Sequence, residues 1–215
     1  MSEIYIIDDH PVMRFGLVAL IDAEKDLKVI GQAGTAAEAF ADLQIKAPDL
    51  VLIDVTLPDK NGLELVKDLR AIHSNLLVLI VSMHDENTYA ERALRAGARG
   101  YVMKEEAPDK LVQAVRQVLT GGVFVSDAVS ARIVQNFANG RSAQGFGIGR
   151  LTDRELEVFR LLGEGKASRE IAGMLHISVR TIDAHRTHIK EKLGFKDATE
   201  LMHQAVKWVE TGELD

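Results

Sequence analysis

Five polar residues stand at the ends of short apolar runs along the chain. They are Asp8 and Asp9 after the first run, Asp54 after the third, Ser82 at the end of the fourth, and Lys104 after the fifth. Three carboxylates brought together would repel one another and resist full ionisation unless a cation is present. Such a small set of hard oxygen ligands suits Mg²⁺, which keeps several waters and recruits a phosphate oxygen. A lysine ammonium and a serine hydroxyl suit the oxygens of a phosphoryl group.

The apolar runs predict the strands that would bring these side chains together. Each run is continuous rather than alternating, which suits strands buried on both faces, as in a parallel sheet. The predicted strands are Ile4–Ile7, Leu27–Ile30, Leu50–Ile53, Leu76–Val81 and Gly100–Met103. Ligands of open α/β sheets gather at the carboxyl ends of the strands. A solvated loop position would explain any one of the polar residues equally well, but their joint placement favours a shared site.

Helical patterns separate the predicted strands. They cover Val12–Ile21, Ala36–Ile45, Leu63–Ile72, Asn87–Ala96 and Pro108–Leu119. Thr35 and Glu38 form a capping-box pattern before the second helix, and Pro108 fits the first turn of the fifth. Five strand–helix units predict an α/β, doubly wound, five-stranded parallel sheet with helices on both faces.

A second, all-helical region follows the two glycines at 121 and 122. Val129, Ile133 and Phe137 recur at helical spacing, and Asn139–Gly149 is rich in glycine and polar residues, as in a flexible tether. Thr152 and Glu155 then form a second capping-box pattern, and Ser178 is a predicted N-cap. We expect a small all-α domain with its later helices at Ser168–Leu175, Val179–Leu193 and Asp197–Val209.

Composition excludes several classes of protein. The 215-residue chain is 47% hydrophobic and 27% charged, as in ordinary globular proteins, and it has no cysteine for disulfides, thiolate metal sites or thiol nucleophiles. Its longest relevant apolar run, Leu76–Val81, has six residues, far below the ~18–20 of a membrane span. The first residues show no secretory signal. We expect a soluble, cytoplasmic protein with no membrane partner.

The net charge of −6 is unevenly distributed. Residues 1–120 hold 13 basic and 19 acidic side chains, whereas residues 150–208 hold 11 and 9. An acidic first part and a mildly basic second part predict different partners for the two. The small positive excess does not by itself indicate nucleic acid.

Four segments of the first region carry a family resemblance. They are IYIIDDH (Ile4–His10), LVLIDVTLPDKNG (Leu50–Gly62), LLVLIVS (Leu76–Ser82) and GARGYVMK (Gly97–Lys104). Over residues 3–120 the chain resembles the receiver domain of a bacterial response regulator, which implies a flavodoxin-like fold.

The resemblance implies a role for each polar residue. Asp54 would be the phosphoacceptor, attacking the phosphohistidine of a sensor histidine kinase. The implied Mg²⁺ ligands are Asp9 and Asp54 directly, Asp8 mainly through water, and the backbone carbonyl of Thr56. The implied phosphoryl and switch contacts are Ser82, Lys104 and Tyr101. By pattern alone, a tyrosine in a strand is more often a packing residue.

Three segments of the second region carry another resemblance. LTDREL (Leu151–Leu156), GKASREIAGML (Gly165–Leu175) and ISVRTIDAHRTHIKEKLG (Ile177–Gly194) are similar to the LuxR-type helix-turn-helix domain, over residues 150–209. The combination resembles a response regulator of the NarL/FixJ type. It implies double-stranded promoter DNA as a partner and a homodimer on activation, with RNA polymerase a further candidate partner.

The helix expected at Val179–Leu193 has two faces. Ile182, His185, Ile189 and Leu193 share one, so His185 is interpreted as a packing residue rather than a metal ligand. The opposite face is polar, which suits a helix in the major groove, although a solvated face would explain this helix taken alone. The candidate DNA-binding residues are Arg180, Thr181, Asp183, Ala184, Arg186, Thr187, Lys190 and Lys192.

Asp183 departs from the family pattern, because a basic residue is common at this position in relatives. Its carboxylate could accept a hydrogen bond from a cytosine amino group, or it could act only as an electrostatic brake on DNA binding. The sequence leaves both interpretations open.

These observations predict a transcription factor controlled by phosphorylation, without enzymatic turnover beyond slow self-dephosphorylation. Its expected parts are a receiver domain (residues 1–120), a linker with a short helix and a tether (121–149) and a DNA-binding domain (150–215). A phosphatase of the haloacid dehalogenase type is one alternative, but it needs a second aspartate two residues after the nucleophile, where Thr56 stands. A constitutive DNA-binding protein with a vestigial acidic pocket is another.

Overall fold

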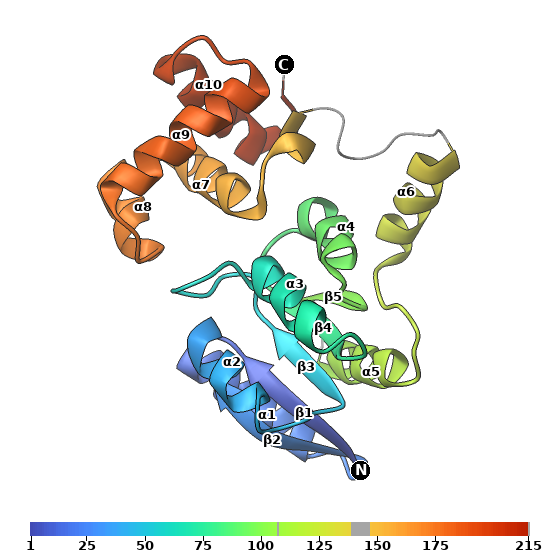
Figure 1. Cartoon of the computed structure of the whole chain (residues 1–215). Helices are drawn as coiled ribbons and strands as arrows, with labels where there is room; N and C mark the ends of the chain where they lie inside the picture. Colours follow the sequence, from blue (N-terminus) through green and yellow to red (C-terminus); the bar gives the residue numbers. More distant parts are fainter. Residues whose placement is uncertain (107, 139–146, 215) are drawn as a thin grey trace. The chain divides into compact units, whose positions relative to one another are not determined.

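The computed structural model describes residues 1–106, 108–138 and 147–214. The chain divides into two compact units, Met1–Gln135 and Asn136–Asp215, and each is described by itself (Figure 1). Most of the tether predicted at Asn139–Gly149 lies outside the described residues, as does the side chain of Phe137. The last three residues of that segment are not tether, because Gly147–Arg150 forms a short 3-10 helix, η1.

The first unit is built on a five-stranded sheet. Its strands are β1 (Ser2–Ile7), β2 (Leu27–Ala33), β3 (Leu50–Ile53), β4 (Leu77–Ser82) and β5 (Gly100–Met103). They lie in the order β2-β1-β3-β4-β5, and every neighbouring pair is parallel. All four residues of β3 are buried, which explains the continuous apolar run. The predicted α/β doubly wound fold is confirmed.

Five helices cover the two faces of this sheet (Figure 1). They are α1 (Pro11–Asp22), α2 (Ala36–Leu43), α3 (Gly62–Ile72), α4 (Glu86–Ala96) and α5 (Pro108–Leu119). Helices α1 and α5 contact each other and bury their apolar sides against one face, while α3 contacts α2 and α4. The second helix ends at Leu43 rather than at Ile45, because Ile45 is 89% exposed and has no core to join.

Only half of the first predicted capping box forms. The Thr35 hydroxyl accepts from the Glu38 backbone N–H, as expected. The Glu38 carboxylate, however, accepts from the backbone N–H of Gly34 at 3.0 Å instead of from that of Thr35. The first donors of the helix are satisfied by Asp59 instead, whose carboxylate accepts from the Ala36 and Ala37 N–H groups, each at 2.9 Å.

Helix α6 (Asp127–Ala138) begins firmly attached to the first unit. Phe124 pairs beside β5, donating to Arg99 O and accepting from Tyr101 N, each at 2.9 Å. The Ser126 hydroxyl donates to Glu86 Oε1 at 2.7 Å, and Arg132 Nη1 donates to Asn87 Oδ1 at 3.0 Å. These two bonds join α6 to the first turn of α4.

The second unit contains four helices after η1: α7 (Asp153–Gly163), α8 (Ser168–Met174), α9 (Val179–Leu193) and α10 (Ala198–Thr211). The capping box of Thr152 with Glu155 and the Ser178 cap are both confirmed. His176, with a φ of +50°, makes the tight turn before α9. The buried apolar side chains include Leu156, Phe159, Ile171, Ile182, Ile189, Leu201 and Trp208. Within the described residues, no helix is both long and apolar enough to cross a membrane.

Candidate functional site

The sheet topology brings the predicted carboxylates together. Asp8 and Asp9 follow β1 and Asp54 follows the adjacent strand β3, where Asp54 N donates to Ile7 O at 2.9 Å. Ligand atoms of Asp8, Asp9, Asp54 and also His10 all lie within 4.8 Å of one another. Asp8 and Asp54 are 1% and 4% exposed, so two of the three acids are buried. His10 was missed by the sequence analysis, although its place directly after the acidic pair could have suggested it.

Lys104 is the counter-charge of this cluster. Its Nζ lies 2.6 Å from Asp54 Oδ2 and 2.6 Å from Asp8 Oδ2, and its side chain is 2% exposed. Burial raises the pKa of Asp54, against the opposing attraction of Lys104. Burial alone would lower the pKa of Lys104, but attraction and hydrogen bonding to the two carboxylates outweigh it and the pKa is raised. One ammonium among three carboxylates leaves a negative excess, and this oxygen donor set fits a divalent cation such as Mg²⁺.

The remaining predicted residues lie around this acidic cluster. Ser82, at the end of β4, is fully buried, and its hydroxyl accepts from His84 N at 3.3 Å. The Thr56 N–H lies 3.4 Å from Asp54 Oδ1, and the Thr56 hydroxyl is 2.9 Å from His84 Nε2. Tyr101 is 2% exposed and donates to His84 O at 2.8 Å. Burial raises the pKa of Tyr101 above its usual range, so this phenol stays a donor.

Gly62 lies directly against the backbone of Asp54, and the sequence analysis missed this close approach. A Cβ at Gly62 would lie 2.0 Å from the carbonyl oxygen of Asp54. The Gly62 N–H donates to Val55 O at 2.7 Å, and the Asn61 side chain caps α3 by accepting from Leu63 N. The Asn61-Gly62 pair in the sequence is a turn signal that could have indicated this close approach.

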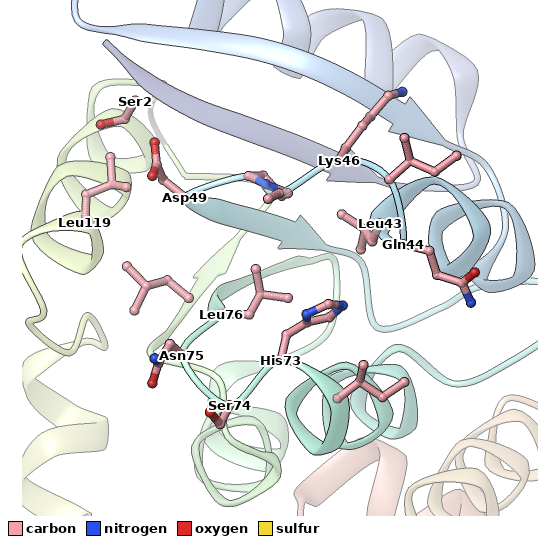
Figure 2. A pocket seen from close by; sticks show the side chains of 15 residues that line it. Ser2, Leu43, Gln44, Lys46, Asp49, His73, Ser74, Asn75, Leu76 and Leu119 are labelled. Carbon is pink, nitrogen blue, oxygen red and sulfur yellow. The ribbon is translucent and has the colours of Figure 1, made fainter.

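A separate pocket of about 720 Å³ lies at the opposite end of the sheet. It borders the amino-terminal starts of β1, β3 and β4 (Figure 2), near Ser2, Asp49 and Leu77. Leu43, Leu76 and Leu119 alternate there with polar side chains. None of the predicted site residues lines it, and a mixed wall of this kind points to no particular chemistry.

Helix α9 has the two faces that its sequence predicts. Ile182 and Ile189 are buried, His185 is partly buried, and burial lowers the pKa of His185. The exposed candidates are Arg180, Thr181, Asp183, Ala184 and Thr187, and the partly exposed ones are Arg186, Lys190 and Lys192.

Two of the basic candidates on α9 already have protein partners. Lys192 Nζ lies 2.6 Å from Glu155 Oε2, the same carboxylate that caps α7. Arg186 Nη1 donates to the Ser168 hydroxyl at 2.7 Å. The sequence analysis treated Glu155 only as a capping residue, so the ion pair with Lys192 was missed.

Fold and site together define a class of protein: a doubly wound α/β domain with an acidic cluster at the carboxyl ends of its strands, followed by a small all-helical domain. The family model described as response regulator receiver domain matches residues 4–116. The model described as bacterial regulatory proteins, luxR family, matches residues 150–205.

Relatives match nearly the whole chain. The transcriptional regulatory protein UhpA of Salmonella typhimurium is 35% identical over 204 residues, covering 95% of this chain and 97% of that protein. The oxygen regulatory protein NreC of Staphylococcus carnosus is 33% identical over 212 residues, covering 95% and 97%. The structure of RcsB from Salmonella enterica bound to promoter rprA with the phosphomimetic BeF3⁻ is similar with a TM-score of 0.64, 25% identity, and coverage of 94% and 96%. The chain therefore belongs to the NarL/FixJ-type response regulators, which combine a receiver domain with a LuxR-type DNA-binding domain.

Proposed function

We propose that this protein accepts a phosphoryl group on Asp54 from a sensor histidine kinase and thereby controls its binding to promoter DNA. The observation that carries the proposal is the position of Lys104, whose ammonium bridges Asp54 and Asp8 at the carboxyl ends of the strands. Residues 1–120 would be the receiver domain, 121–149 the linker and 150–215 the DNA-binding domain. We place the protein in the bacterial cytoplasm, with a homodimer as its active form and RNA polymerase as a further partner.

In this proposal, each step of phosphoryl acceptance falls to a residue of the acidic cluster. A carboxylate oxygen of Asp54 attacks phosphorus, and the bond between phosphorus and the imidazole nitrogen of the donor breaks as the new bond forms. Asp8, Asp9, Asp54 and the Thr56 carbonyl would hold Mg²⁺, which supplies positive charge to offset the oxygens of the phosphoryl group. Lys104, already 2.6 Å from Asp54, turns to the added oxygens.

Phosphorylation changes the charge of a buried site. The phosphoryl group brings about −1.5 to −2 charges, and it draws the Ser82 hydroxyl and the Lys104 ammonium toward it. The Tyr101 hydroxyl, on β5, donates to the backbone carbonyl of His84, which lies two residues after Ser82. Movement of Ser82 therefore acts on the surface around α4 and β5, which is the bistable element of the proposal.

The DNA-binding roles fall on the exposed side of α9. Arg180, Thr181, Asp183, Ala184 and Thr187 would face the major groove, and Arg186, Lys190 and Lys192 would serve the phosphate backbone. The similar RcsB structure holds promoter DNA together with a phosphomimetic, which supports the pairing of these two activities in one chain.

Treatment of the full chain with a small phosphodonor and Mg²⁺ tests the proposal. We expect one phosphoryl group per chain by mass spectrometry, together with dimerisation and tighter promoter binding. Asp54→Asn should abolish labelling, and Asp9→Ala should suppress it by removing a metal ligand, whereas Asp8→Ala should have a partial effect.

Three outcomes would contradict the proposal. Equal labelling of Asp54→Asn would show that the acceptor is wrong. Sustained turnover of small phosphate esters would favour the phosphatase alternative. Promoter binding that needs no Mg²⁺ and is unchanged in Asp54→Asn would favour constitutive binding.

A further inference from the structure

One serine hydroxyl joins two oppositely charged side chains of helix α9. Ser168 is the first residue of α8, and its Oγ accepts from Arg186 Nη1 at 2.7 Å. The same Oγ lies 3.5 Å from Asp183 Oδ1. Asp183 and Arg186 are three residues apart on α9, so they share one side of that helix. In the described part of the chain, no other hydrogen bond or ion pair is made by either charged group.

The direction of these bonds gives the cluster a polarity. A guanidinium can only donate, so the Ser168 oxygen is the acceptor, and its own proton is free to point at Asp183. The chain of donors therefore runs from Arg186 through Ser168 to Asp183 Oδ1. The positive charge of Arg186 and the serine proton both offset the carboxylate, while no described residue donates a hydrogen bond to its second oxygen, Oδ2.

We propose that Ser168 is a specificity-determining positioning residue, which fixes Asp183 so that Oδ2 accepts a hydrogen bond from the amino group of a cytosine. The inference rests on the proposed function, in which α9 enters the major groove. It revises the proposed function at one residue, because it assigns Arg186 to Asp183 through Ser168 rather than to a DNA phosphate.

Charge compensation is the reason to favour base recognition over an electrostatic brake. A carboxylate without a partner is repelled by the phosphates of both DNA strands, whereas one offset by a tethered guanidinium is not. Arg180 and Lys190, on the same helix, make no ion pair with any described residue and keep their charge for DNA. The cluster thus leaves the helix attractive to DNA and Asp183 able to discriminate.

Selection of DNA sequences by the full chain and its variants tests this. We expect Asp183→Ala to relax the preference at one base position per half-site by about fivefold to a hundredfold, and Ser168→Ala to relax the same position. The double variant should lose little more base preference than either single variant, because each substitution removes the same interaction. Ser168→Thr, which retains the hydroxyl, should keep the preference.

A matched control separates this inference from the proposed function. Lys190→Gln should weaken binding to all sequences and lower the salt slope by about one unit, with base preference unchanged. If Lys190→Gln behaves so but Ser168→Ala leaves the preference intact, the inference is wrong and the proposed function stands. Asp183→Ala that binds every sequence more tightly with unaltered preference would also overturn it. No sequence preference in the phosphorylated parent would overturn the proposed function as well.

Discussion

At the scale of single residues, the lifetime of a phosphoryl group on Asp54 depends on whether nearby side chains can orient a water molecule for hydrolysis. Thr56 lies two positions after Asp54, and His84 lies two positions after Ser82. Their side chains contact each other at 2.9 Å, and the His84 ring stacks on Tyr89 with centroids 4.8 Å apart. Neither side chain is a carboxylate or carboxamide able to orient a hydrolytic water, and each already has a partner.

We therefore predict that phosphorylated Asp54 lasts many minutes or longer. The measurement is the decay of the label on the full chain after removal of the phosphodonor, with Mg²⁺ present. Thr56→Asn, which introduces a carboxamide, should shorten the lifetime. Loss of the parent's label within seconds, without any phosphatase, would show that another group activates water.

A histidine in the second unit gives a pH dependence of known sign. Burial lowers the pKa of His185, and the positive charges of Arg154 and Lys192 lower it further, against the opposing carboxylate of Glu155. The unfolded chain thus binds a proton at a higher pH than the folded unit does. Stability from the neutral ring is present above the unfolded pKa of about 6.5 and is lost as pH falls below it.

The fluorescence of Trp208 reports urea unfolding of the second unit. We expect the midpoint to lie at a lower urea concentration at pH 5.5 than at pH 7.5, two values on either side of about 6.5. His185→Gln should reduce this difference. His203→Gln is the control, since His203 is an exposed histidine on α10. An unchanged difference in His185→Gln would place the effect on another group.

At the scale of elements, the first residues of α3 and α4 position the side chains around Asp54 more than the rest of these helices does. The start of α3 rests on the backbone of Asp54, and the start of α4 follows directly from the segment that carries Ser82 and His84. The start of α4 also holds α6 through Glu86 and Asn87. A change at Ser82 therefore has a short path to α6, along the backbone as far as α4 and then through these two hydrogen bonds.

Two glycine substitutions test the role of the α3 start. Gly62→Ala should destabilise the first unit by about 2 kcal/mol or more, because its Cβ would lie 2.0 Å from Asp54 O, and labelling of Asp54 should slow. Gly16→Ala in α1 is the matched control: a Cβ there meets no atom within 4 Å, so we expect a gain of about 0.5–1 kcal/mol. Chemical denaturation measures both, and equal effects of the two would contradict the close approach.

At the scale of the whole molecule, the two units carry different chemistry and can be observed separately. The acids and Lys104 lie in the first unit, whereas the single tryptophan of the chain, Trp208, lies buried in the second. Circular dichroism follows both units, while tryptophan fluorescence follows the second alone. A cation bound by the acidic pocket stabilises only the unit that holds it.

We predict that Mg²⁺ raises the unfolding temperature of the first unit and leaves the Trp208 transition unchanged. At about ten times its dissociation constant, a ligand adds about 1.4 kcal/mol, which corresponds to roughly 3–6 °C. Asp9→Ala should remove the shift, because Asp9 is the most exposed of the three acids and the most accessible to the ion. A Mg²⁺ shift retained by Asp9→Ala would place the ion elsewhere.

Much of this protein follows from its sequence alone. The apolar runs predicted all five strands, because strands such as β3 and β4 are buried on both faces, and parallel strands place Asp8, Asp54 and Lys104 at one edge. The capping pattern of Thr152 with Glu155 also predicted a helix start, since its partners are three residues apart and depend on local backbone only.

Only the tertiary structure decided which side chains meet across long separations. Lys104 bridges Asp54 and Asp8, and Gly62 lies against the carbonyl of Asp54. Glu155 pairs with Lys192, and Ser168 joins two charged side chains of α9. All of these are contacts between packed elements. Periodicity states which face of a helix is buried. It does not state the register at which that face meets its neighbour, and a shift of a few ångströms there would separate every one of these pairs.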